Sequence, residues 1–299
     1  MPPPVQFARR VALRHGVRGA HAEEITGLGS ENHVVVVGED AGRVVVRFAR
    51  DRSKPAVFAS EAWCARRSAT AGVPTAEILA TGTLDGIDYG VQELVPGRPA
   101  AAGPAAWETL GAYAAAIHRI VPDGDAPDAL FTRFGRDPAA AWHSHLAYNL
   151  DRLTDDDDVL LRLGAYSVAE RAEIRDRAAA LRDVPFSFGL SHGDLSVRNL
   201  LVRTDGPPVL LDWGCASFGP ALYLDLLALE RERDTTGHPS AEEMDAFVAG
   251  AEADRSVIAT VLPAFRLVQR HDLVRWALER RPDRLDESVS GLRAALAME

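Results

Sequence analysis

A short stretch near the middle of the chain, HGDLSVRN at 192–199, places polar side chains between two aliphatic runs. Within it, His192, Asp194 and Asn199 have the spacing H-x-D-x-x-x-x-N. Asp212 follows in DWG, at the end of the next aliphatic run. A carboxylate can orient a hydroxyl and accept its proton, and amide and carboxylate oxygens are the hard ligands that Mg²⁺ prefers. The separations suit a catalytic loop that closes onto a hairpin.

The alternative is that this stretch is an ordinary polar turn between two strands. Chance would rarely place H-x-D-x-x-x-x-N and a following strand that ends in D-x-G in one chain. We therefore favour the chemical interpretation, which requires neighbouring elements that hold the loop in place.

The first hundred residues contain mostly strand-like runs. Rich in β-branched residues and separated by polar turns, these runs predict two hairpins. The expected strands are 33–38, 43–50, 75–84 and 87–95. Apolar spacing, together with start and stop residues such as Ser53, Pro55 and Gly72, predicts helices at about 8–22 and 53–71.

From Trp107 onward the hydrophobic pattern is mostly helical. Apolar residues recur every three to four positions in 107–121, 141–153 and 167–182, and Ser167 with Glu170 suits a capping box. The polar loop interrupts this series between short strand-like runs, at 188–191, 199–202 and 209–214. The expected class is therefore α+β, with a β-rich first part and a larger helical second part.

HGDLSVRN followed by DWG resembles the catalytic loop and metal-binding turn of the protein-kinase-like phosphotransferases. HGD in place of HRD is similar to the aminoglycoside (antibiotic) phosphotransferase family, and the resemblance extends from about residue 24 to Asp225. It implies a bilobal fold. A small β-rich, nucleotide-binding N-lobe would span 1–97, and a larger, mostly helical lobe with the catalytic and substrate-binding residues would span 98–299.

The same resemblance implies transfer of phosphate from ATP, with GTP as an alternative donor, to a hydroxyl of a small molecule. Such transfer needs Mg²⁺, positioning and charge neutralisation rather than covalent help. Asp194 would orient the hydroxyl, Asn199 and Asp212 would bind Mg²⁺, and His192 would be a scaffold residue. Arg198 has two interpretations of equal weight: it stabilises the transferring phosphoryl group, or it pairs with a surface carboxylate.

In the first lobe the family usually has a lysine on the third strand, and this chain departs from that pattern. Period-two alternation in VVVRF puts Val45 and Arg47 on one face, and Lys54, the single lysine, falls past the strand. Arg47 is therefore the expected phosphate-binding cation, with Glu61 of the following helix as its partner. The alternatives are a solvent-facing strand arginine and an exposed helix glutamate.

Further nucleotide contacts are expected from the resemblance. In GLGSEN, Gly29 would let backbone amides approach phosphates and Ser30 would add a hydroxyl donor. Backbone groups from Glu93 to Val95 would contact adenine, although the same residues also suit a plain connector. Asp225, after a Gly-Pro turn, resembles the family's aspartate that steadies the catalytic loop.

Composition limits the partners and the location. The net charge of −10 argues against a nucleic-acid surface, which would need a clustered basic stripe. No apolar run reaches the roughly 18 residues that cross a bilayer, and the N-terminus lacks the pattern of a signal peptide. We expect a cytoplasmic protein with Cys64 and Cys215 as thiols. The acidic run at 155–158 is expected to be a solvated loop.

The acceptor is the least determined part of the prediction. An aminoglycoside-type antibiotic, and hence a resistance kinase, is expected first, because HGD occurs in that branch and an acidic protein suits a polycation. A macrolide, choline, homoserine or a sugar is the alternative. A further alternative, motivated by Arg47 in place of lysine, is a nucleotide-binding, pseudokinase-like regulator.

Overall fold

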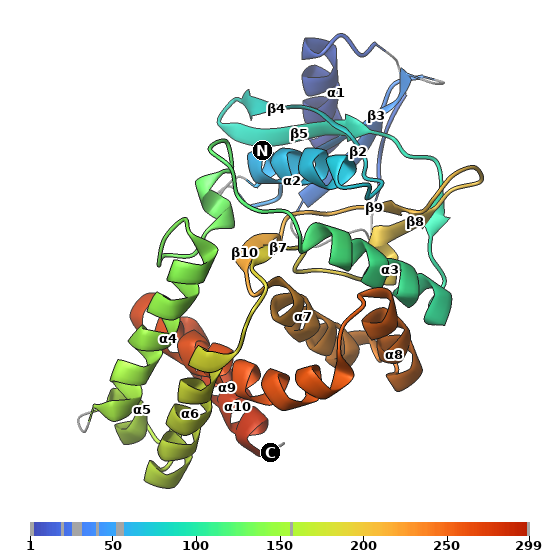
Figure 1. The fold of residues 1–299 in the computed structure, drawn as a ribbon. Helices are drawn as coiled ribbons and strands as arrows, with labels where there is room; N and C mark the ends of the chain where they lie inside the picture. Colours follow the sequence, from blue (N-terminus) through green and yellow to red (C-terminus); the bar gives the residue numbers. More distant parts are fainter. Residues whose placement is uncertain are drawn as a thin grey trace.

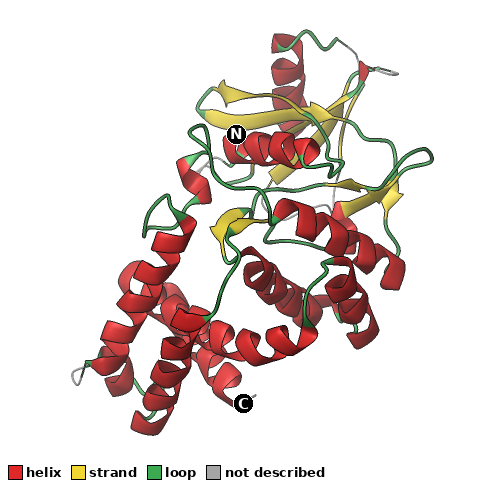
Figure 2. Cartoon of the chain, viewed as in Figure 1, coloured by secondary structure: helices red, strands yellow, loops and turns green. Residues whose placement is uncertain are grey.

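The structure is a computed structural model that describes residues 3–18, 21–25, 32–39, 42–51, 57–155 and 158–297. A β-sheet with two helices occupies one end of the molecule, and most of the helices form the other end (Figure 1). Coloured by secondary structure, the longest strands gather at the first end and short strands lie between it and the helices (Figure 2). The expected α+β class is confirmed. The lobe boundary between residues 97 and 98 stays a prediction.

The larger sheet is antiparallel and has the strand order β1-β2-β3-β5-β4. Its strands are β1 (Ala22–Glu24), β2 (Asn32–Val37), β3 (Val44–Ala49), β4 (Ile78–Leu84) and β5 (Ile87–Glu93). The expected pairs β2–β3 and β4–β5 are both present. β3 is the central strand, because it pairs with β2 on one side and β5 on the other.

Side-chain alternation along β3 divides the sheet into two faces. Val44, Val46 and Phe48 pack in one apolar cluster with helix α1 (Pro4–Arg14). Arg47 points to the other face, where it contacts Glu61 of helix α2 (Phe58–Thr70). The period-two prediction for this strand is therefore confirmed.

The first helix differs from its predicted range of 8–22. Pro4 occupies the first turn, where a missing N–H costs nothing. The helix ends at Arg14, and Gly16 then adopts a φ of +78° that starts the chain on a new course. Ala22 already belongs to β1. The predicted range was wrong because it was based on apolar spacing alone and did not take into account Pro4 as a start signal and Gly16 as a stop signal.

Helix α2 begins at Phe58, whereas its expected start at Ser53 and Pro55 lies outside the described residues. It ends at Thr70, and Gly72, with a φ of +86°, follows as predicted. The helix buries Glu61 against the sheet rather than exposing it.

The second part of the chain is largely helical, as expected. Its helices are α3 (Pro104–Ile117), α4 (Pro138–Thr154), α5 (Val159–Arg162), α6 (Val168–Ala180), α7 (Ala221–Thr236), α8 (Ala241–Gly250), α9 (Arg255–Arg280) and α10 (Leu285–Ala297). The Ser167–Glu170 capping box at the start of α6 is present. The main core cluster joins these helices around buried aromatic residues such as Trp107 and Phe265. No helix among the described residues is both long and apolar enough to span a membrane.

Short strands hold the polar loop between the sheet and the helices. They are β6 (Arg98–Pro99), β7 (Gly189–Ser191), β8 (Leu200–Val202), β9 (Val209–Leu210) and β10 (Ser217–Gly219). β8 pairs with β6 and β9, and β7 pairs with β10. β9 stops before its expected end at residue 214, because Asp212 has a φ of +65° that no extended strand can contain.

Candidate active site

The loop after β7 is anchored by a buried aspartate on α7. Asp225 is fully buried and accepts hydrogen bonds from the N–H groups of His192, at 3.3 Å, and Gly193, at 2.7 Å. His118, just after α3, lies 2.8 Å from the same carboxylate. Gly193 has a φ of +77°, and a Cβ there would come within 2.2 Å of the Cys215 carbonyl oxygen. Glycine is therefore required at the turn into the loop.

His192 ties this loop to the turn that contains Asp212. Its ring is buried, and its Nε2 lies 3.0 Å from the carbonyl oxygen of Leu211. Burial lowers the pKa of His192, although the carboxylates around it oppose the shift. The neutral ring donates from Nε2 to Leu211, and its Nδ1 accepts from the N–H of Asp194 at 3.3 Å. The imidazole thus braces two segments of backbone.

Asp194 and Asn199 lie against each other at the open side of the loop. The Asn199 Nδ2 donates to the Asp194 carbonyl oxygen and to Oδ2 of its carboxylate, both at 2.9 Å. Asn199 ends a short 3-10 turn that begins at Val197, and Ser196 caps that turn by accepting from the N–H of Arg198. The Asp194 side chain remains 31% exposed. A carboxylate fixed in this way can still meet a solvent-borne hydroxyl.

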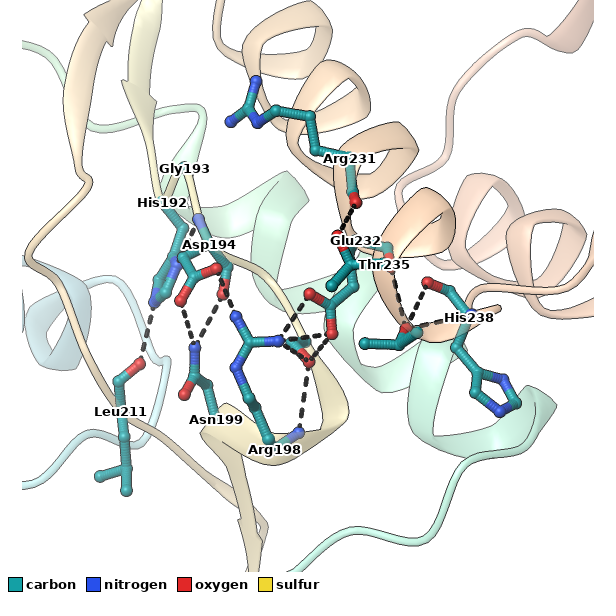
Figure 3. A network of polar contacts seen from close by, with 12 residues as sticks. His192, Gly193, Asp194, Arg198, Asn199, Leu211, Arg231, Glu232, Thr235 and His238 are labelled. Atoms are coloured by element: carbon teal, nitrogen blue, oxygen red, sulfur yellow. Dashed lines mark hydrogen bonds and ion pairs between the residues drawn. The ribbon is translucent and has the colours of Figure 1, made fainter. Parts of the chain in front are cut away.

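Arg198 joins Asp194 to a glutamate on α7 (Figure 3). Its Nη2 donates to Asp194 Oδ1 at 2.7 Å, and its Nη1 lies 2.5 Å from both carboxylate oxygens of Glu232. The Ser196 hydroxyl donates to the same glutamate at 2.8 Å. Of the two interpretations of Arg198, the pairing with carboxylates is therefore present. A contact with a transferring phosphoryl group stays a prediction.

A second arginine, Arg47 of β3, contacts Asp212 from the side of the sheet. Arg47 Nη1 lies 2.6 Å from Glu61 Oε2, and its Nη2 lies 3.3 Å from Glu61 Oε1 and 3.2 Å from Asp212 Oδ1. The Glu61 side chain is 1% exposed and that of Arg47 is 13% exposed. Burial raises the pKa of Glu61, and Arg47 opposes this shift. The alternatives of an exposed strand arginine and an exposed helix glutamate are thus not what the structure shows.

Asp212 has an unusual backbone for its residue type. A φ of +65° is uncommon outside glycine, and such a conformation costs on the order of 1–3 kcal/mol. The His192 bond to Leu211 on one side and the contact of Arg47 with the carboxylate on the other hold it in place. As a result the Asp212 carboxylate turns toward the sheet and stays 46% exposed.

The structure describes only some of the other residues that were predicted to contact the nucleotide. Gly29 and Ser30 lie outside the described residues. Glu93 ends β5, and its N–H donates to the Glu77 carbonyl oxygen at 2.9 Å. The N–H of Val95 donates to no other described residue. Only part of the Glu93–Val95 backbone is therefore free to bind a ligand.

Two residues of this network, Glu232 and His118, were missed at the level of sequence. His118 contacts Asp225, and no local sequence pattern indicated this contact. Glu232 follows Asp225 by seven positions, which places both on one face of a helix. That spacing could have indicated a second acidic contact to the loop.

Comparison with known proteins agrees with this geometry. The sequence profile of the phosphotransferase enzyme family matches residues 23–260. Among curated proteins, none shows significant sequence similarity. A macrolide 2′-phosphotransferase from Brachybacterium faecium is similar in structure, with 19% identity, a TM-score of 0.62, and 97% of this chain and 98% of that chain covered.

Two further solved structures are also similar over most of their length. A spectinomycin phosphotransferase in complex with ADP and spectinomycin has 14% identity and a TM-score of 0.57, and covers 98% of this chain and 95% of its own. An ethanolamine kinase from Plasmodium vivax has 12% identity and a TM-score of 0.59, with 97% and 87% covered. At such identities the likeness shows the fold, while the profile covers most of the sequence. The chain therefore belongs to the phosphotransferase enzyme family, with the kinase-like fold that its loop sequence indicated.

Proposed function

We propose that this chain transfers the γ-phosphate of ATP, with Mg²⁺, to a hydroxyl group of a small molecule. The observation that supports this most is the gathering of Asp194, Asn199 and Asp212 around one braced loop, with Arg47 in contact with Asp212. Phosphoryl transfer needs positioning and charge neutralisation, which these residues can supply.

The nucleotide would lie between the sheet and the loop. Glu61 and Asp212 hold the Arg47 guanidinium at this boundary, where it would bind phosphate oxygens with its fork of N–H donors. The Glu93 carbonyl and the Val95 N–H would bind adenine. GTP would use the same phosphate contacts, so only the base contacts would select between the two donors.

Asn199 and Asp212 would hold Mg²⁺. Both offer hard oxygens, and Mg²⁺ in such enzymes is commonly held by one or two carboxylates together with phosphate oxygens. The described residues contain no group of three or more His, Cys, Asp or Glu that could hold a metal ion. When bound, Mg²⁺ would neutralise charge on the phosphates.

Asp194 would orient the acceptor. Arg198 holds its Oδ1 and Asn199 holds its Oδ2, so the carboxylate has a fixed direction. From there it would accept a hydrogen bond from the attacking hydroxyl and take up its proton as the new O–P bond forms. Arg198 would add positive charge beside the same oxygen.

For the acceptor we retain the two sequence-based candidates. An aminoglycoside is favoured by the net charge of −10, which attracts a polycation. A smaller or less charged alcohol is favoured by the structural likeness to kinases named for macrolides and ethanolamine. A regulator without transferase activity is disfavoured, because Arg47 makes the contacts expected of the usual lysine and the three acidic or amide groups are all retained.

ATP consumption with a panel of alcohols tests this proposal. The panel contains aminoglycosides, macrolides, choline, homoserine and sugars, and the wild-type chain is compared with Asp194→Ala. Acceptor-dependent ADP release should fall at least about a hundredfold in the variant, the typical contribution of a positioned base. Equal rates would refute the role of Asp194. Nucleotide binding without transfer to any acceptor would favour the regulator.

A further inference from the structure

A pocket of about 400 Å³ opens in the helical part of the molecule, next to the loop with Asp194. Ser217 lines it, and this residue pairs with Ser191, the residue directly before His192. Leu224 lines it as well and directly precedes Asp225, the anchor of the loop. The pocket and the loop with Asp194 therefore share a wall. The other walls come from α4 and α9, which lie side by side (Figure 1).

Several aromatic side chains lie in the walls of this pocket. Phe134, Trp142, Phe218 and Trp276 line it. The Phe134 and Trp142 rings lie 5.3 and 5.4 Å from the ring of His145, which lines the pocket as well. Ligand pockets of this size bury most of a small molecule on apolar surface and orient it with a few polar groups. These walls suit a ligand whose body is apolar or carries rings.

One carboxylate in the lining is anchored by one oxygen only. Oδ1 of Asp272 lies 3.4 Å from His145 Nε2, Asn149 Nδ2 and Arg133 Nη2. Oδ2 makes no hydrogen bond or ion pair with any described residue. Burial acts to raise the pKa of Asp272, but His145, Arg133 and Asn149 outweigh it and hold the pKa below the usual range. Asp272 is thus an ionised group with one oxygen available to a ligand.

Carboxylates do not outnumber guanidinium groups in the lining of the pocket. Among the described residues of the lining, Asp272 is the single carboxylate, and Arg133 and Arg280 lie in the same lining. Arg133 packs over Phe134 and contacts both Asp272 and Glu279 at 3.4 Å. A buried ammonium needs a carboxylate or other acceptor to offset its lost hydration. A polycation would therefore bury several ammonium groups against one available carboxylate oxygen and two guanidinium groups.

We infer that this pocket binds an alcohol with an apolar or ring-bearing body and a single ammonium group, which pairs with Asp272 Oδ2. The aromatic side chains would hold the body, and the faces of Phe134 or Trp276 would add cation–π attraction to the ammonium. That this ligand is the phosphoryl acceptor rests on the function proposed above. The inference selects the less charged of the two acceptor classes and sets aside the polycation that net charge alone favours.

Equilibrium binding tests the inference without catalysis. The probes are benzyltrimethylammonium, with one charge and one ring, the neutral benzyl alcohol, and the polycation kanamycin. Calorimetry and the fluorescence of Trp142 and Trp276 report binding to the full chain. Benzyltrimethylammonium should bind more tightly than the other two. Asp272→Asn should weaken its binding about tenfold or more, because the quaternary ammonium, which has no N–H and is attracted by charge alone, loses the carboxylate charge in the lining.

Glu279→Gln is the matched control for Asp272→Asn. Glu279 contacts the same Arg133 but does not line the pocket, so its loss changes the charge around Arg133 without removing the carboxylate that faces the ligand. This control should leave binding of benzyltrimethylammonium within about twofold. Trp276→Leu, which removes an aromatic side chain and keeps Asp272, should weaken binding of both benzyl probes, benzyltrimethylammonium and benzyl alcohol.

Three results would overturn the inference: kanamycin binding more tightly than benzyltrimethylammonium, an unchanged affinity in Asp272→Asn, or equal losses in Asp272→Asn and Glu279→Gln. A different result would refute the proposed function. Asp194→Ala should bind the probe like the wild type, so probe binding without transfer to any alcohol would refute the kinase and leave the pocket intact.

Discussion

Arg47 and Arg198 are two arginines that do similar work in different settings. Each connects a predicted acidic site residue to a glutamate: Arg47 connects Asp212 to Glu61, and Arg198 connects Asp194 to Glu232. Arg47 is 13% exposed on a strand, whereas Arg198 is 50% exposed on a loop. In both cases a glutamate holds the arginine in place, and the arginine in turn orients the aspartate of the site.

Burial decides how much each arginine should contribute. Arg47 and Glu61 form a pair that water hardly screens, and removing one partner of such a pair leaves an uncompensated charge. Arg198 is screened by solvent, so its contribution rests on geometry more than on charge. The sheet-side arginine should therefore affect both stability and nucleotide binding, and the loop-side arginine mainly the orientation of Asp194.

Arg47→Ala should have the largest effect. It leaves Glu61 buried without its cation, which typically destabilises a protein by about 3–5 kcal/mol. Loss of charged hydrogen bonds to phosphates should also weaken ATP binding by roughly ten- to a hundredfold. Urea denaturation and calorimetry with an ATP analogue measure the two effects.

Lys54→Ala is the control for this prediction, because Lys54 is the single lysine of the chain. It should change ATP binding much less than Arg47→Ala. The opposite ranking would mean that the strand has been assigned the wrong phosphate-binding cation.

Glu232→Gln should have an intermediate effect. It removes the charge that holds Arg198, so Asp194 loses part of its fixed direction, and we expect kcat to fall about tenfold while KM for ATP is unchanged. Steady-state kinetics with the acceptor identified by the panel measures this split.

Glu230→Gln is a matched control for Glu232→Gln. Glu230 lies on the same helix and pairs with Arg266 at 2.5 Å, with 17% exposure compared with 13% for Glu232. If both variants lose kcat equally, the effect comes from destabilising α7 rather than from positioning Arg198.

The pH dependence of stability should come from a histidine outside both arginine networks. His271 is buried, its Nδ1 lies 2.6 Å from Asn149 Oδ1, and burial lowers its pKa from 6.5 to about 3. Because the folded pKa lies below the unfolded one, the unfolded chain binds an extra proton as pH falls from about 6.5 toward 3. This residue therefore removes about 1.4 kcal/mol of stability per pH unit in that window.

Urea denaturation at pH 7 and pH 5 measures this slope. His271→Gln should be less stable than the wild type at pH 7 and should lose less stability between the two pH values. An identical pH dependence in both proteins would show that His271 does not remain neutral in the fold.

Local patterns made much of the first arginine predictable. Alternation along a strand fixes the face of Arg47, and a helix that follows at once limits where Glu61 can lie. The loop spacing likewise indicated that Asp194 and Asn199 belong to one functional loop, and their direct contact was found in the structure. In these cases the partners are close in sequence or lie on regular elements, so periodicity places them.

The second arginine shows where sequence patterns stop. Glu232 lies 34 positions beyond Arg198, and their contact depends on how α7 packs under the loop. The left-handed backbone of Asp212 and the short β9 also depend on tertiary contacts, here with His192 and Arg47. The first helix was misplaced for a different reason, because apolar spacing alone outweighed Pro4 and Gly16.

The most direct test of the central claim is detection of the phosphorylated product. The wild-type chain and Asp194→Asn are each incubated with ATP, Mg²⁺ and the preferred alcohol, and phosphorus NMR follows the γ-phosphate while calorimetry measures affinity for an ATP analogue. We predict a new phosphomonoester signal with the wild type, its loss in Asp194→Asn, and similar nucleotide affinity for both. A phosphomonoester that forms at the same rate in Asp194→Asn would contradict the account.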